Sequence, residues 1–247
     1  IVACAILSWQ MTVVLFEIPT WKLPAPSAIA MELIEERKLF WHHFLVTLSE
    51  VIIGFAAALI AGVSLAFLVV YFRTFQRAVY PFLIASQTIP IIVMAPLLLI
   101  WVGYGITPKI IIVVLIAFFP IVINTVDGMQ SVDADMINMM RTLGAKKRQV
   151  FTKIQIPCSL PFLFSGIKIA VTYSVIGAVI GEWVGSSAGL GYLTRVSVPL
   201  FLTERSFGAV ILLAVMGMLL FLTATILERM LLPWYHNPRR ENLLGNL

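Results

Sequence analysis

The stretch DGMQSVDADMINMMRTLGAKKRQVFTKIQIPCSLP, from Asp127 to Pro161, is the longest polar interruption in an otherwise apolar sequence. It contains five of the 17 Lys and Arg residues of the chain. Its pattern predicts a short amphipathic helix, a glycine stop, a basic helix and a proline break, in that order. A polar segment with this much predicted structure, placed between apolar runs, indicates a docking surface for a partner outside the lipid.

The composition is that of an integral membrane protein. Of the 247 residues, 60% are hydrophobic and 12% are charged, whereas a soluble domain is about 45–50% apolar and about 25% charged. In a soluble protein the net charge of +5 would suggest nucleic acid. Here basic residues that fix membrane orientation explain it better, so no nucleic-acid partner is expected. The sequence contains no GxxxxGK[ST], HExxH, GxSxG or CxxC motif, so we expect no enzyme and no bound cofactor or metal.

Apolar runs of bilayer length predict an all-α fold with six transmembrane helices. The expected spans are residues 1–16, 44–72, 81–103, 109–126, 161–183 and 207–232. We expect a first span with an external amphipathic segment (1–43), a five-span core with the loop 127–160 (44–232), and a tail (233–247).

Particular residues predict how these spans are shaped. Pro90 and Pro96 predict a kinked or broken third span, because each proline removes a helical hydrogen bond. Gly54 and Gly62 predict close helix contacts along the second span, since small residues let helices approach in lipid. Ser27 is expected to cap the external amphipathic helix.

The distribution of positive charge predicts the orientation. Ten Lys and Arg residues fall in the expected basic turn 73–80, in the loop 127–160 and in the region from Arg229. Six fall in 17–43, the turn ending at Lys109, and 184–206. The positive-inside rule then places the loop 127–160 and both termini in the cytoplasm.

Within the loop, apolar residues at helical spacing form one stripe, made of Met136, Met139, Met140 and Leu143. Asp133 and Asp135 precede the stripe, where acidic groups favour a helix N-terminus. Gly144 suits a left-handed helix stop. Pro157 and Pro161 are expected to end the basic helix before span five. Methionines adapt to partner surfaces and favour a docking role. The alternative is a helix resting on lipid headgroups.

The loop resembles the EAA motif of binding-protein-dependent ABC importer permeases. That motif is EAA, three residues, Gly, nine residues, Ile, one residue, Leu-Pro. Gly144, Ile154 and Pro157 match it, Ile156 stands for Leu, and Asn138-Met139-Met140 stand where the family has EAA. The segments LPAPS (23–27) and GLGYL (189–193) are similar to the branch that imports nitrate, sulfonates, taurine and pyrimidine precursors.

The resemblance implies a type I importer permease in a prokaryotic plasma membrane. It implies a homodimer, a cytoplasmic ABC ATPase dimer that uses ATP, and an extracytoplasmic substrate-binding protein. The loop would supply the coupling helix between spans four and five. The residues expected to couple to the ATPase are Met136, Met139, Met140, Arg141, Leu143, Gly144, Ala145, Ile154 and Pro157.

Polar groups within the spans are candidates for the translocation pathway. An ionisable group in the membrane costs roughly 3 kcal/mol on insertion scales and is usually functional or paired. Glu182, beside Trp183, and Glu50 fit an outer gate, with Gly181 and Gly185 supplying backbone freedom. Interfacial carboxylates in water are the alternative. Gln87 and Asn124 are weaker candidates, because helix–helix hydrogen bonds explain them equally well.

The favoured function is therefore the permease of an ATP-driven importer of a small polar solute. The segment GEWVGSSAGLGYL favours a pyrimidine or thiamine precursor, with sulfonate, taurine or nitrate as other possibilities. The main alternative is an ion-coupled secondary transporter that works without an ATPase. A membrane scaffold for a cytoplasmic enzyme is a third reading, which the predicted broken span argues against.

Overall fold

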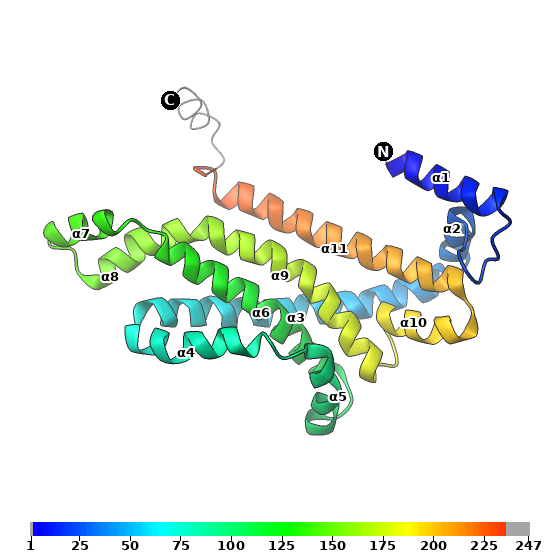
Figure 1. The fold of residues 1–247 in the computed structure, drawn as a ribbon, viewed down its shortest axis with the longest axis horizontal. Coiled ribbons are helices and arrows are strands. Elements are labelled where there is room, and N and C mark those ends of the chain that lie inside the picture. The colour runs from blue at the N-terminus through cyan, green and yellow to red at the C-terminus, as the bar shows by residue number, and fades with distance from the viewer. Residues whose placement is uncertain (1, 236–247) are drawn as a thin grey trace. The chain divides into compact units, whose positions relative to one another are not determined.

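The computed structural model describes residues 2–235, apart from the side chains of Val2 and Arg73, and builds them from helices without a strand (Figure 1). Four of these helices are long and apolar enough to cross a membrane. They are α3 (Arg37–Tyr71), α6 (Ile106–Gln130), the continuous helix Lys147–Gly185 and α11 (Thr203–Leu231). The predicted tail, 233–247, lies outside the described residues beyond Tyr235.

A fifth span is present if α4 (Arg73–Ser86) and α5 (Ile91–Val102) count as one interrupted crossing. The first apolar helix, α1 (Val2–Leu15), has 14 residues, fewer than the roughly 20 that a straight crossing needs. The all-α membrane class is confirmed, and the total of six spans stays a prediction.

The third predicted span is broken, as expected, and the break falls at residues 87–90, directly before α5. Pro90 ends the break, whereas Pro96 lies inside α5 without interrupting it. The predicted turn at 73–80 is wrong. Only Phe72 separates α3 from α4, and Arg77 lies within α4.

The chain packs as two compact units. Unit 1 comprises the chain up to Gly54, Ile91–Val114 and Ser174–Met218, and unit 2 comprises Phe55–Pro90, Leu115–Tyr173 and the chain from Leu219.

In unit 1, the external helix is α2 (Pro26–Glu35), which begins one residue before Ser27. The predicted Ser27 cap is wrong, because Ala25 is the N-cap residue and makes no side-chain cap. The Gln10 amide bonds Ser27 instead, donating to its Oγ and accepting from its backbone N–H at 3.1 Å each. Two carboxylates, Glu32 of α2 and Glu36 just after it, bind the Arg205 guanidinium of α11 at 2.8 and 3.2 Å.

In unit 2, the apolar core joins α3, α4 and α6 through Ala66, Val69, Leu83, Val122 and Val126. The close helix contact predicted at Gly62 is confirmed, because a Cβ added there would fall 2.9 Å from the Ile121 side chain. Gly54, in unit 1, makes a similar close contact, because a Cβ added there would fall 2.5 Å from the Val113 side chain.

Unit 2 also contains an ion pair between two long helices. The Lys168 ammonium of α9 (Ile156–Gly185) lies 2.9 Å from a carboxylate oxygen of Glu228 on α11. The side chains are 23% and 5% exposed, so this pair is partly open.

Candidate functional site: a docking helix and a buried polar cluster

The predicted amphipathic helix is α7 (Ala134–Thr142), and both of its ends are fixed by local chemistry. Asp133 is the N-cap, and its carboxylate accepts a hydrogen bond of 2.9 Å from the Asp135 N–H. This bond satisfies a backbone donor that a helix start leaves free. Gly144, with φ +83°, stops the helix in the left-handed region as predicted. The Ala145 N–H donates to the Met140 carbonyl at 2.9 Å and closes the turn.

The methionine stripe of α7 has no covering element in the described chain. Met136 is 46% exposed, Met139 58% and Leu143 76%. Met140 is half-buried, and Arg141 is exposed on a different face of the helix. Figure 1 shows α7 projecting with α8 (Lys147–Val150) beyond the C-terminus of α6 and the N-terminus of α9. The stripe is therefore an apolar surface that unit 2 leaves open.

The predicted proline break after the loop is wrong. A π-helical turn, η1 (Phe151–Gln155), leads straight into α9, so the helix is continuous from Lys147 to Gly185. The Ile156 N–H reaches back five residues to the Phe151 carbonyl. An α-helical turn would crowd the Pro157 ring against the preceding turn, and the wider π turn relieves this contact. Pro157 is exposed and Ile154, within the π turn, is half-buried.

In unit 1, Glu182 of α9 is fully buried and lies at the start of α10 (Leu190–Ser197). Its carboxylate accepts hydrogen bonds from the backbone N–H groups of Gly191 and Tyr192 and from the Thr47 hydroxyl, the last at 2.6 Å. A charged acceptor suits a helix start, where N–H groups lack partners. Glu182 thus fastens α10 to α3 and α9, in a segment for which the sequence predicted no helix.

Two further bonds tie the same segment to α3. The Gly189 N–H donates to His43 Nδ1 at 2.9 Å, and the Leu190 N–H donates to the Thr47 hydroxyl at 2.8 Å. Gly189 has φ +117°, and a Cβ there would fall onto the Glu182 carboxylate. Only glycine therefore allows the backbone to approach the carboxylate this closely.

Glu50 is buried in unit 1 and forms an ion pair with Lys109 at the start of α6. The Lys109 ammonium also donates to the Ser186 hydroxyl at 3.0 Å. Glu50 is not the interfacial carboxylate in water that was one reading of the sequence, since its side chain is 1% exposed. Gly181 serves close packing rather than backbone freedom, because a Cβ there would fall 3.1 Å from the Lys109 backbone.

The remaining pathway candidates lie elsewhere. Trp183 is 50% exposed, and its indole N–H donates to the Thr194 hydroxyl at 3.3 Å. Asn124 and Gln87 belong to unit 2 and are not part of the buried polar cluster. Asn124 donates to the Pro120 carbonyl of its own helix at 2.8 Å, and Gln87 is exposed at the end of α4.

Lys109, Thr47, His43 and Ser186 complete the cluster and were missed as site residues. Lys109 directly precedes an apolar run and was counted as a loop charge. A signal for its role was present, because a lysine beside one span can pair with a glutamate in another span. No comparable signal marks Thr47. Among residues 2–235, no group of three His, Cys, Asp or Glu side chains is arranged to hold a metal ion.

The four long apolar helices and the interrupted helix pair define a multi-pass helical membrane protein, with ion pairs and hydrogen bonds buried between its helices. The chain belongs to the family of binding-protein-dependent transport system inner membrane components, whose model matches residues 37–237. It is thus a permease of an ABC transporter, the translocation component that works with an ATPase and a binding protein.

Several relatives have the same role. The chain is 41% identical to the formylaminopyrimidine transport permease protein ThiX of Halalkalibacterium halodurans over 213 residues, which cover 86% of this chain and 85% of the relative. It is 36% identical to the riboflavin transport system permease protein RibX of Chloroflexus aurantiacus, covering 92% and 85%. It is 31% identical to the putative aliphatic sulfonates transport permease protein SsuC of Bacillus subtilis, covering 94% and 85%. The family to which the sequence resemblance pointed is confirmed.

Proposed function

We propose that α7 is the coupling helix of this permease and that its methionine stripe docks into a cytoplasmic ABC ATPase dimer. The observation that carries the proposal is the exposure of Met136, Met139 and Leu143 on one face of a helix that the described chain leaves uncovered. Flexible thioether side chains adapt to a partner groove. Burial of such a stripe would stabilise the complex by roughly 25 cal/mol per Å² of apolar surface.

The ends of α7 explain how it would transmit movement. Asp133 caps its start and Gly144 sets its stop, so the helix is bounded at both ends. Ala145 and the π turn with Ile154 lead directly into α9, which is continuous with the loop and is not separated from it by a proline break. A displacement of α7 by the ATPase would therefore reach a long helix through a short, structured connection.

We infer that the solute is a small polar molecule of the pyrimidine-precursor type. Support comes from the 41% identity with the formylaminopyrimidine permease over most of both chains. Sulfonate, taurine and riboflavin permeases are also among the relatives, and nitrate remains from the sequence resemblance. ATP would be used by the partner subunit, and this chain would bind no cofactor.

Glu182 and Glu50 would act at the outer gate by holding α10 and α6 in place, rather than as free carboxylates that meet the solute. Trp183, Gln87 and Asn124 remain candidates for contact with the solute along the path. We further propose a homodimer in a prokaryotic plasma membrane, with both termini in the cytoplasm.

Reconstitution into liposomes tests the function. The chain would be combined with the ATPase and the binding protein encoded by neighbouring genes, and uptake of labelled formylaminopyrimidine would be followed with ATP at the ATPase face. We expect uptake that needs both ATP and the binding protein, and that excess taurine, sulfonate, nitrate or riboflavin does not reduce. Competition by one of those solutes would reassign the substrate. Uptake driven by an ion gradient without the ATPase would establish the secondary transporter instead.

A further inference from the structure

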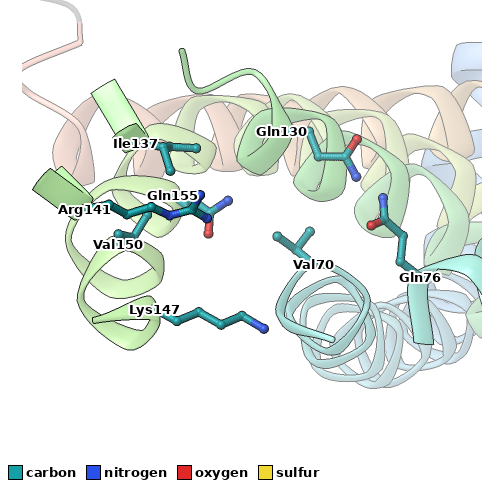
Figure 2. A pocket seen from close by; sticks show the side chains of 8 residues that line it. All are labelled: Val70, Gln76, Gln130, Ile137, Arg141, Lys147, Val150 and Gln155. Atoms are coloured by element: carbon teal, nitrogen blue, oxygen red, sulfur yellow. The ribbon is translucent and has the colours of Figure 1, made fainter. Parts of the chain in front are cut away.

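A cavity of about 310 Å³ lies in unit 2 between the docking loop and the ends of α3, α4 and α6. Figure 2 shows Arg141 and Lys147 extending into it from the loop side, with Gln130 and Gln76 on the opposite side beyond Val70. Ile137, Val150 and Gln155 complete the lining. We propose that this cavity binds a phosphate-bearing anion. The proposal goes beyond the transport function and does not depend on it.

The charge of the lining points to an anion. Two of the lining side chains are cationic, three are amides and three are apolar, and none is a carboxylate. Within the part of the chain that the structure describes, the Arg141 guanidinium makes no hydrogen bond or ion pair, and neither the Gln76 nor the Gln130 side-chain amide has a hydrogen-bond partner. A guanidinium offers five N–H donors in a planar fork that matches the oxygens of a phosphate. Unused donors therefore converge on the cavity from the loop and from the helices opposite.

Lys147 is positioned for the same ligand while it also serves the fold. Its ammonium donates to the Tyr71 carbonyl at the last residue of α3 and lies 4.6 Å from the centre of the Tyr71 ring. A carbonyl at a helix end lacks an intrahelical partner and carries partial negative charge, so this contact is favourable. An ammonium has three donors, and the bond to Tyr71 leaves two for a ligand.

The cavity uses a different edge of α7 from the methionine stripe. Ile137 and Arg141 are four residues apart and share one edge of the helix, and both line the cavity. An anion held there would link Arg141 of α7 and Lys147 of α8 to the amides of Gln76 on α4 and Gln130 on α6. The bound ligand would brace the docking helix against the helices of unit 2.

Size and lining suggest two sources for such an anion. The volume lies at the lower end of small-molecule pockets, which span about 300–1,000 Å³. It suits a single phosphate group with a small substituent, and basic pockets at helix ends recognise lipid headgroups. The shared chemistry is a phosphate oxyanion, and the source is either an anionic phospholipid or a free phosphate.

The test measures binding to the full-length chain purified in neutral detergent. In one arm, native mass spectrometry counts phosphatidylglycerol retained by the chain, with phosphatidylcholine as the neutral comparison. In the other arm, inorganic phosphate is titrated and followed by its phosphorus resonance. Arg141→Gln should weaken binding about tenfold, as expected for one lost charge-assisted contact. Arg148→Gln is the matched control, because Arg148 is exposed on α8 outside the cavity and loses the same charge.

Each outcome decides the proposal. Phosphatidylglycerol retention that falls with Arg141→Gln and not with Arg148→Gln supports a lipid site, and the same pattern with inorganic phosphate supports a free-anion site. Gln130→Leu, which keeps the charge, should also weaken binding. Absence of binding in both arms, or equal losses for the two arginine variants, overturns the site. Loss of ATPase co-purification with Arg141→Gln at unchanged anion binding would assign the cavity to the protein partner and also overturn it.

Discussion

Replacement of Lys109 by methionine removes the ammonium that pairs with Glu50 inside unit 1. The two side chains are 9% and 1% exposed, and the second oxygen of Glu50 is already buried without a hydrogen-bond partner among residues 2–235. The variant leaves a buried carboxylate without its cation, and such a change costs about 3–5 kcal/mol. The Ser186 hydroxyl loses its bond from Lys109 as well.

The assay is unfolding of the purified chain in mixed micelles with increasing SDS, followed by tryptophan fluorescence. A loss of about 3 kcal/mol raises the unfolding equilibrium constant by roughly 100-fold. Glu50→Leu alone should be similarly harmful, because it strands the ammonium. The double variant should lie close to the wild type, since an apolar pair of similar volume replaces a buried ion pair at little or no loss.

The control is Glu228→Leu, which breaks the pair with Lys168 and leaves the Lys168 ammonium without its partner. The Lys168 side chain is 23% exposed, against 9% for Lys109, so its charge is less enclosed and we expect a smaller loss than for Glu50→Leu. Equal losses for Glu228→Leu and Glu50→Leu, together with additive effects of the two Glu50 and Lys109 substitutions, would refute the argument that burial isolates this pair.

Three further predictions concern the docking helix and the α10 segment. Leu143→Asp should abolish co-purification of the ATPase without unfolding the chain, because Leu143 is 76% exposed. The control Thr142→Asp, which lies off the stripe, should still co-purify with the ATPase. ATPase that is retained by Leu143→Asp would count against the coupling assignment. Glu182→Gln should slow ATP-driven uptake, because an amide holds the α10 N–H groups less strongly; uptake at the normal rate would sink the gate role. Gly189→Ala should destabilise the chain by about 2 kcal/mol or more, and Gly144→Ala by about 1 kcal/mol. Both glycines have a positive φ, but only at Gly189 would an added methyl group meet a carboxylate. Equal shifts in melting temperature for the two variants would contradict this.

Local patterns in the sequence predicted the helix α7 and its two ends well. The stripe spacing, Asp133 before it and Gly144 after it concern residues near one another in the chain, and these short-range signals agree with α7 and its stop. The apolar runs predicted the long helices for the same reason. Their number and exact ends were harder to predict. Helix α3 extends back to Arg37, into the segment that was predicted to be external, and α4 extends back to Arg73, into the region that was predicted to be a basic turn.

The buried polar cluster depends on contacts that no local pattern encodes. Glu182 and Glu50 were found because carboxylates are rare in apolar spans. The partner of Glu182, Thr47, lies 135 positions away, and Lys109 lies 59 positions from Glu50. Such pairings are decided by packing. In the structure, Glu182 and Glu50 are therefore bonded to neighbouring helices, whereas the sequence suggested free carboxylates.

The π-helical turn at Phe151–Gln155 accommodates one residue more than an α-helical turn would hold. Each residue of an α-helix turns the chain by about 100°. With α-helical winding of the same five residues, the start of α8 would be rotated by about that angle relative to α9. The methionine stripe of α7 would then face another direction. Deletion of one residue within Phe151–Gln155 would instead restore α-helical winding and leave α8 facing nearly the same way, because the π turn already holds the extra residue. The π turn thus sets the direction that the methionine stripe faces.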